Sequence, residues 1–312
     1  MNEEGWMYIL LLLAVSIISI MLYRKIVETR IINSDWYKKE GFSQNEPLVY
    51  KKNQDVYDDE FYVKSYDKLN LPNRRVPHEL KIIIDTTMAT PANSVILDIG
   101  SGTGYTVNEL TDLGFRTFGI DKSNAMVQYS KQRYDSIPVK TGDVQNQMTF
   151  DRASFSHNLC LYFTIYDFEE KRTLFKNCYF WLKPGGYLVI HLVDKNNFDT
   201  TIPAKKDIIF GSPQRYEDKR ITDQMIRFSD FQYKSTYDFD SSSSNVYITE
   251  SFTDSSNQKI RENERVLYMN DIQEILNLAT LTGFIPQGKI KLKESTGDEH
   301  QYLYFLERPN SV

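Results

Sequence analysis

Short apolar runs alternate with amphipathic segments through the middle of the chain. The runs at residues 94–100, 116–121 and 187–193 have the length and composition of buried strands. Between them, residues 105–113 and 123–133 carry apolar side chains at helical spacing. Strands and helices joined by short connections predict an open α/β sheet that is mostly parallel, with helices on both faces.

The pattern changes after Asp194. Residues from about 222 to 269 alternate between polar and apolar side chains, which is typical of antiparallel strands with one exposed face. A last helix, at residues 270–283, and a final pair of strands follow. The sequence therefore predicts a strand-rich insert, at about residues 200–269, in front of the last helix of the α/β domain.

The N-terminus has a different character. Residues 6–23, WMYILLLLAVSIISIMLY, contain no charge and show no amphipathic period. A helix of this length would span about 27 Å, close to the thickness of a bilayer core. We predict an N-terminal transmembrane anchor at residues 1–27, a tether at 28–56 and a folded domain at 57–312.

The charges on either side of this apolar segment predict its orientation. Glu3 and Glu4 precede it, and Arg24, Lys25 and Arg30 follow it. Positively charged flanks stay on the cytoplasmic side of a membrane. The expected localisation is therefore a single-pass membrane protein with its N-terminus outside and its folded domain in the cytoplasm.

Composition narrows the possible partners. The net charge of −5 and the scattered basic doublets argue against a nucleic-acid partner, which usually needs a basic face. The two cysteines, Cys160 and Cys178, lie in different predicted elements, and the four histidines are dispersed. We predict two reduced thiols and no metal site.

The stretch VILDIGSGTGYT, at residues 95–106, joins a predicted strand to a predicted helix through a glycine-rich turn. A phosphate-binding loop would need a lysine and a hydroxyl residue where Tyr105 and Thr106 stand. A dinucleotide fingerprint would place its third glycine at position 105, but the third glycine is Gly104. The turn therefore fits neither a nucleoside triphosphate nor a dinucleotide.

Three aspartates suggest a different ligand. Asp98, beside the turn, would repel a pyrophosphate but attract an ammonium or sulfonium group. Asp121 ends the next strand, where a carboxylate can bind ribose hydroxyls, and Asp143 follows the third strand, within reach of an adenine. The ordered set suits an adenosyl amino acid. The alternative is that the glycines only turn a strand into a helix.

With these features the sequence resembles class I S-adenosylmethionine-dependent methyltransferases. The matching segments are VILDIGSGTG, FGIDKSNAMVQYSKQR, TGDVQ and LKPGGYLVIHLV, and the resemblance covers residues 57–194, the last helix and the last two strands. The segment YDDEFYVKSYDKL is similar to the N-terminal helix of the glycine and sarcosine N-methyltransferase-like group. The resemblance implies a Rossmann-like, seven-stranded sheet whose last strand is antiparallel.

The resemblance also implies which residues bind S-adenosylmethionine. The turn would contact the methionine half, the end of the next strand the ribose, and the following segment the adenine. The expected cofactor-binding residues are Asp98, Gly100, Ser101, Gly102, Gly104, Asp121, Lys122, Asp143 and Val144.

Candidate catalytic residues lie in and after the fourth strand. His157 is a candidate base because it is expected at the carboxyl edge of the sheet; alternatively, it only hydrogen-bonds the cofactor or a loop. Tyr162 could cover the methyl group or shape an acceptor pocket, or belong to the core. Tyr62 and Tyr66 share a helix face and could close over the cofactor or only dock the helix.

We therefore expect an S-adenosylmethionine-dependent methyltransferase that acts by in-line displacement on an unidentified acceptor, most simply a small molecule. Nitrogen, oxygen and carbon acceptors all remain open. The alternative is a catalytically silent, membrane-anchored protein that binds the cofactor or serves as a scaffold. A nicotinamide oxidoreductase is disfavoured by Asp98 and Tyr105.

Overall fold

The computed structural model describes residues 15–21, 48–207, 211–255 and 258–310. The chain divides into two units, Met1–Pro47 and Leu48–Val312. Most of the predicted membrane span at residues 6–23 lies outside the described residues; the described part, residues 15–21, is an exposed helix. None of the helices in the described ranges has the length and apolar character that crossing a bilayer requires.

The second unit is built around a seven-stranded sheet with the order β11-β12-β6-β5-β2-β3-β4. Its strands are β2 (Val95–Ile99), β3 (Arg116–Asp121), β4 (Val139–Thr141), β5 (Phe155–Cys160), β6 (Leu182–Val193), β11 (Ile285–Lys291) and β12 (Gln301–Glu307). The strands from β6 to β4 are parallel, whereas β12 runs antiparallel to both of its neighbours. The predicted Rossmann-like, mostly parallel sheet is confirmed, including its antiparallel last strand.

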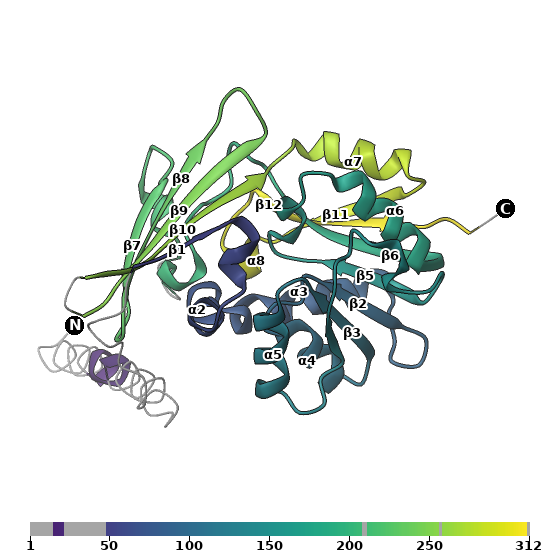
Figure 1. Ribbon diagram of the computed structural model, residues 1–312, viewed down its shortest axis with the longest axis horizontal. Helices are drawn as coiled ribbons and strands as arrows, with labels where there is room; N and C mark the ends of the chain where they lie inside the picture. Colours follow the sequence, from purple (N-terminus) through teal and green to yellow (C-terminus); the bar gives the residue numbers. More distant parts are fainter. Residues whose placement is uncertain (1–14, 22–47, 208–210, 256–257, 311–312) are drawn as a thin grey trace, which may run out of the picture. The chain divides into compact units, whose positions relative to one another are not determined.

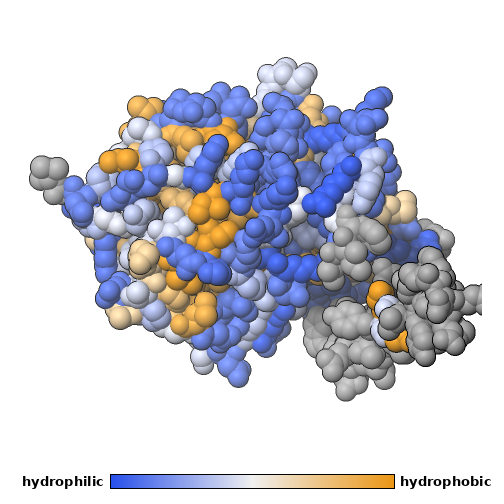
Figure 2. Space-filling model, turned by 180° about the vertical axis from the view of Figure 1, so that it is seen from behind, coloured by the Kyte–Doolittle hydropathy of each residue, from blue (hydrophilic) through white to orange (hydrophobic). Residues whose placement is uncertain are grey.

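Helices cover both faces of this large sheet, as expected. They are α3 (Pro72–Thr87), α4 (Tyr105–Asp112), α5 (Asn124–Arg133), α6 (Lys171–Trp181) and α7 (Ile272–Leu281). Figure 1 shows α6 and α7 on one side of the sheet and α3, α4 and α5 on the other. Two apolar clusters fill the two interfaces, so the central strands are buried on both faces. Seen from behind, hydrophilic side chains dominate the surface and separate smaller apolar areas (Figure 2).

A second sheet has five strands in the order β1-β10-β9-β8-β7. The strands are β1 (Val49–Lys52), β7 (Asp223–Arg227), β8 (Gln232–Phe239), β9 (Asn245–Thr253) and β10 (Lys259–Tyr268). All its pairs are antiparallel except that of β1 with β10. This small sheet confirms the predicted strand-rich insert. In β9 every second residue from Val246 to Phe252 is buried, so one face of the sheet points inward.

The helix α2 (Glu60–Asn70) packs against the small sheet and also contacts α5 (Figure 1). Its first turn is capped by Asp59, whose carboxylate accepts a hydrogen bond of 2.9 Å from the Tyr62 amide. The same carboxylate forms an ion pair with Arg261 of β10. The helix is therefore attached to the small sheet at its N-terminal end.

Short helices complete the described part of the chain. They are η2 (Asn53–Tyr57), η3 (Gln147–Thr149), η4 (Thr164–Asp167), η5 (Pro203–Lys205), η6 (Pro213–Tyr216) and α8 (Lys293–Thr296).

The predicted domain boundary needs a correction. Residues 28–56 were expected to form a tether, but β1 and η2 lie within this range and belong to the folded unit that begins at Leu48. The strand β1 is only four residues long and is mostly exposed, so its sequence lacks the alternation that identifies a strand. Its partner β10 lies about two hundred positions further on, which no local pattern shows.

Local sequence signals do not fix every element boundary. Proline suits the first position of a helix, but α3 starts at Pro72 and contains Pro77 in its interior. Leu71 separates α2 from α3 by adopting a left-handed conformation with a φ of 40°. Leucine rarely adopts this conformation, so the sequence does not predict a helix break at this position. Residues 183–186, KPGG, have the composition of a turn but lie within β6, where Gly185 has a φ of 74°.

Candidate active site

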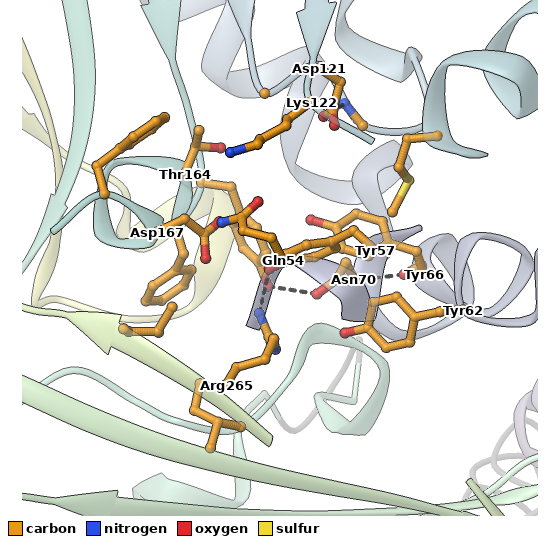
Figure 3. Close-up of a pocket in the computed structure, with 18 of the residues that line it drawn as sticks. Gln54, Tyr57, Tyr62, Tyr66, Asn70, Asp121, Lys122, Thr164, Asp167 and Arg265 are labelled. Carbon is orange, nitrogen blue, oxygen red and sulfur yellow. Dashed lines mark hydrogen bonds between the residues drawn. The ribbon is translucent and has the colours of Figure 1, made fainter. Parts of the chain in front are cut away.

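A cavity of about 510 Å³ lies between the carboxyl edge of the large sheet, α2 and the inner face of the small sheet (Figure 3). Its volume is within the range of about 300–1,000 Å³ that is usual for small-molecule sites. The loops after β2, β3, β4 and β5 form one wall, and residues of β8, β9 and β10 form the other. Open α/β sheets bind ligands at the carboxyl ends of their strands, at the point where the strand order reverses.

The glycine turn after β2 has three left-handed residues, with φ values of 69° at Gly100, 52° at Gly102 and 79° at Gly104. A Cβ atom on Gly104 would lie 2.7 Å from Ser130 and one on Gly100 would lie 2.6 Å from Thr164, so both glycines allow close packing. A Cβ atom on Gly102 would meet no atom nearer than 4.0 Å. Gly102 lines the cavity, and its open side can face a ligand.

Asp121 ends β3 and lines the cavity. Its carboxylate accepts hydrogen bonds of 2.8 Å from the backbone amides of Gly102 and Ser123. Burial raises the pKa of Asp121, and these two amides oppose the rise. The carboxylate is therefore held in one orientation, with lone pairs still available for ribose hydroxyls.

The predicted adenine-side residues lie together at the same wall. Lys122 Nζ and Asp143 Oδ2 form an ion pair of 3.3 Å. The other oxygen of Asp143 accepts a hydrogen bond of 2.9 Å from the Gln145 amide. Lys122, Asp143 and the buried Val144 all line the cavity, as do Gly100 and Gly102.

Asp98, Ser101 and Gly104 lie behind the lining of the cavity rather than in it. Asp98 is 4% exposed, and its carboxylate has no hydrogen bond or ion pair among the residues that the structure describes. Burial raises its pKa to about 8, although the charge of Arg75 opposes the rise. The buried hydroxyl of Ser101 also lacks a partner in the described part of the chain.

These features test whether S-adenosylmethionine suits the site. A buried carboxylate without a partner is costly, and the ammonium of an amino-acid ligand could relieve that cost. The open side of Gly102 and the fixed carboxylate of Asp121 suit a ligand that passes close to the backbone and carries hydroxyl groups. The residues present fit the cofactor.

The expected position of His157 at the carboxyl edge is wrong. The strand β5 continues to Cys160, so His157 lies in the middle of the strand and outside the cavity lining. Its ring is stacked on that of Tyr187, with 6.1 Å between the centroids, and its Nδ1 is 2.8 Å from the Ser156 hydroxyl. Burial lowers its pKa to about 4, so the imidazole is neutral at physiological pH.

Tyr162, the other catalytic candidate, lines the cavity just after β5. Its backbone is left-handed, with a φ of 54°, a conformation that costs a non-glycine residue free energy and is often found at functional sites. Its hydroxyl donates a hydrogen bond of 3.0 Å to Asn70 Oδ1, and the Arg75 guanidinium lies 4.1 Å from its ring centre. Both helices at the α2–α3 junction therefore hold this side chain in place.

Three charged residues of the cavity, Asp167, Glu250 and Arg265, were not among the predicted site residues. Asp167 is the last residue of η4. It is half-buried and lines the cavity (Figure 3). Burial raises its pKa to about 6, and the charge of Arg265 and a hydrogen bond from Tyr57 oppose the rise. It has no ion pair with any residue of the described ranges.

A buried carboxylate on β9 organises the small-sheet wall. Glu250 is 2% exposed and accepts hydrogen bonds of 3.1 Å from the Tyr62 hydroxyl, 2.8 Å from the Tyr233 hydroxyl and 3.1 Å from Asn263 Nδ2. Arg265 Nε lies 3.5 Å from the same carboxylate. Tyr62 thus docks α2 and lines the cavity, and its closure over the cofactor stays a prediction.

Comparisons with known proteins agree with this geometry. A family model described as a methyltransferase domain matches residues 97–190. Phosphoethanolamine N-methyltransferase of Plasmodium falciparum (isolate 3D7) is 33% identical over 120 residues, which are 34% of this chain and 43% of that protein. The chain thus spans less than half the length of this curated relative.

Solved structures share the fold. A methyltransferase from Clostridium acetobutylicum ATCC 824 matches with a TM-score of 0.59 and 14% identity, covering 80% of this chain and 98% of its own. CalS10, an amino pentose methyltransferase from Micromonospora echinaspora solved with S-adenosylmethionine bound, matches with a TM-score of 0.55 and 17% identity, covering 80% and 97%.

The matched methyltransferase domain and the fold shared with these structures support a class I S-adenosylmethionine-dependent methyltransferase. The chain carries the methyltransferase domain of that family over residues 97–190. The resemblance to this class is therefore confirmed, and the narrower likeness to the glycine and sarcosine group stays a prediction.

Proposed function

We propose that the chain transfers a methyl group from S-adenosylmethionine to the nitrogen of a small amine. The observation that carries the proposal is the position of Asp167, a carboxylate that faces the cavity from the large-sheet wall and has no ion pair among the described residues. Phosphoethanolamine N-methyltransferase, which is similar over part of its length, also acts on an amine according to its name.

The glycine turn and its aspartates hold the cofactor in this proposal. Asp121 binds ribose hydroxyls, Asp143 and Val144 contact the adenine, and Asp98 compensates the ammonium of the methionine half. When bound, S-adenosylmethionine supplies an electrophilic methyl group, whose bond to sulfur breaks as the acceptor's lone pair forms the new bond.

Asp167 performs the acceptor-side chemistry. A free amine is protonated at neutral pH, so its ammonium must be bound and then deprotonated before its nitrogen can attack. An ionised carboxylate serves both steps, and a pKa of about 6 leaves Asp167 ionised at pH 7. Aromatic rings line the same cavity and can stabilise a cation through their faces: Tyr57, Tyr62, Tyr66, Tyr162, Phe163, Phe168, Tyr233 and Tyr237.

A panel of small primary amines and their matched alcohols tests the proposal, with methylated product measured by mass spectrometry. We expect turnover of amines only. Asp167→Asn should lower kcat by about 10²–10⁴-fold and leave the affinity for S-adenosylhomocysteine within about twofold. The control is Asp238→Asn, an exposed aspartate of β8. Turnover of alcohols without amines, or full activity of Asp167→Asn, would contradict the proposal.

The pH dependence gives a second test. Because the base must be ionised, kcat/KM, which reports the free enzyme, should rise with pH through a value near 6, the pKa of Asp167. Asp167→Asn should lose this rise and leave a flat, low profile over the same range. An unchanged profile in the variant would assign the rise to another group.

We also propose, from the apolar pattern at residues 6–23 and its flanking charges, that the chain is anchored in a membrane with the folded domain on the cytoplasmic side. Cell fractionation with alkaline extraction tests this proposal. The full chain should stay in the membrane fraction, and a variant that lacks residues 1–27 should be released. Equal release of both would contradict it.

A further inference from the structure

We infer that the acceptor carries an anionic group in addition to its amine, and that Arg265 of β10 binds this anion. The inference rests on the proposed amine methylation and specifies its substrate class as a small zwitterion. Three observations support it. Arg265 directs hydrogen-bond donors into the cavity, Glu250 does not use these donors, and Asp167 lies in the same cavity.

Arg265 still has unused hydrogen-bond donors. Its side chain is 15% exposed, lines the cavity and points into it (Figure 3). Its Nη1 donates a hydrogen bond to the Tyr57 hydroxyl, and its Nη2 has no partner in the part of the chain that the structure describes. A guanidinium carries five N–H donors in a planar fork. Arg265 therefore presents its terminal nitrogens to whatever occupies the cavity.

Glu250 does not use up this side chain. Its carboxylate already accepts hydrogen bonds from Tyr62, Tyr233 and Asn263. Its contact with Arg265 is at Nε, at 3.5 Å, on the side of the guanidinium that faces the small sheet. Glu250 therefore orients the guanidinium from behind and leaves Nη2 and the second N–H of Nη1 for a ligand. The spacing of these two nitrogens matches that of the two oxygens of a carboxylate or phosphate.

Asp167 faces the same cavity with the opposite charge. The charge of Arg265 lowers the pKa of Asp167, and a hydrogen bond from Tyr57 acts in the same direction, so the three side chains are close neighbours. Tyr57 also accepts a hydrogen bond from Arg265. This hydroxyl therefore interacts with both charged side chains, which form no direct ion pair among the described residues.

The arrangement selects against ligands with a single charge. A simple amine would bring its ammonium towards both Asp167 and Arg265, and a simple anion would meet both Arg265 and Asp167. Like-charge contacts of this kind disfavour the wrong ligand, whereas complementary contacts favour the right one. A zwitterion satisfies both side chains, with its anion on Arg265 and its ammonium on Asp167.

The first experiment measures anion binding alone. The full chain, saturated with S-adenosylhomocysteine, is titrated by calorimetry with inorganic phosphate and, separately, with acetate. We expect at least one of them to bind at millimolar concentration, and its Kd to rise at least tenfold in Arg265→Gln. The matched control is Arg227→Gln, an exposed arginine on β7 of the same sheet, which should bind like the wild type.

The second experiment measures the effect of the anion on turnover. Amines that carry a phosphate, amines that carry a carboxylate and plain amines are compared by KM. We expect one anionic series to have a KM at least tenfold below that of the plain amines, and Arg265→Gln to abolish this difference. The two series also distinguish a phosphate from a carboxylate as the group recognised.

Several outcomes would overturn the inference. The inference is wrong if the wild-type protein binds neither anion, if Arg265→Gln binds the anion as well as the wild type does, or if plain amines have the lowest KM. If Arg265→Gln fails to bind S-adenosylhomocysteine or to melt cooperatively, Arg265→Lys replaces it; retaining the charge without the fork, it should show a smaller rise in Kd. Amine turnover with no anion preference overturns this inference alone, whereas anion binding with no amine turnover overturns the proposed function alone.

Discussion

The large and small sheets contribute to the cavity in different ways. The large sheet acts mainly through backbone: a glycine turn, the ends of parallel strands, and carboxylates such as Asp121 that backbone amides hold in place. The small sheet acts through side chains, with Glu250 joining residues of α2, β8 and β10. The large-sheet wall is therefore suited to a constant ligand, the cofactor. The small-sheet wall is suited to an acceptor that differs between proteins.

This difference predicts that substitutions on the two walls will have different effects. Changes at the glycine turn should alter cofactor affinity, because the turn approaches the ligand with its backbone. Changes in the small-sheet network should alter stability and acceptor recognition, because its members support one another.

The largest expected effect is from Glu250→Ala. Removing this carboxylate leaves the Tyr62 and Tyr233 hydroxyls without an acceptor and Arg265 without its neighbouring charge. Breaking a buried ion pair in this way costs about 3–5 kcal/mol in the free energy of unfolding. Chemical denaturation measures the loss. Glu264→Ala, at an exposed glutamate of the same sheet, is the control and should cost about 0–1 kcal/mol. A loss below about 1 kcal/mol for Glu250→Ala would show that the Glu250 network does not stabilise the fold.

The glycine turn offers a matched pair of substitutions. Both Gly102→Ala and Gly104→Ala force a left-handed alanine, which costs about 1–2 kcal/mol. Gly104→Ala also drives its Cβ to 2.7 Å from Ser130, adding about 1–3 kcal/mol of overpacking. Gly104→Ala should therefore have the lower melting temperature. Gly102→Ala should lose more S-adenosylhomocysteine affinity than Gly104→Ala for the same decrease in melting temperature. The reverse order would mean that Gly102 is not the point of ligand approach.

Asp98→Asn should move binding and stability in opposite directions. In the proposed function the charge of Asp98 compensates the ligand's ammonium, so its loss should weaken S-adenosylhomocysteine binding by about 10–100-fold, or about 1.4–2.8 kcal/mol. The ligand-free variant should be more stable than wild type at pH 8, because it no longer buries an ionised carboxylate. Calorimetry and denaturation measure the two effects.

The stability of the ligand-free wild type should also depend on pH through Asp98. Its folded pKa of about 8 lies above the unfolded value of about 3.9, so the folded state holds a proton that the unfolded state has lost. The free energy of unfolding should therefore fall as pH rises from about 4 to about 8. A stability profile that Asp98→Asn leaves unchanged would contradict this assignment.

The smallest effect belongs to Tyr162→Phe. The variant loses the hydrogen bond to Asn70 but keeps its ring against Arg75, so it should cost about 0.5–1.5 kcal/mol in unfolding. Tyr302→Phe is the control, because the Tyr302 hydroxyl makes no hydrogen bond within the described ranges. Equal costs for the two would show that the Tyr162 hydroxyl does not stabilise the fold.

The cofactor wall could be predicted from the sequence because its signals are local. Gly100, Gly102, Asp121, Asp143 and Val144 all follow recognisable strands, and all line the cavity. The adjacency of those strand ends is a general property of parallel sheets. What these residues bind stays a prediction, which the Asp98 and glycine variants test.

The acceptor wall could not be predicted because it depends on distant contacts. Tyr62 and Glu250 are separated by 188 positions, and Arg265 reaches back to Tyr57 across 208. An alternating strand pattern shows which residues face inward, but not which helix they meet. His157 was misplaced for a different, local reason: β5 runs on to Cys160, so the carboxyl end of the strand lies beyond the histidine.

The small sheet is connected to the rest of the domain at few points in the sequence. The strands β7 to β10 all lie between β6 and α7 in the sequence, and among the described residues only β1 joins them from elsewhere in the chain. We therefore expect that this segment can be exchanged without altering the strand order of the large sheet. A chimaera that receives residues 200–269 from another enzyme, together with the matching helix α2, would keep its methyl donor and acquire a new methyl recipient.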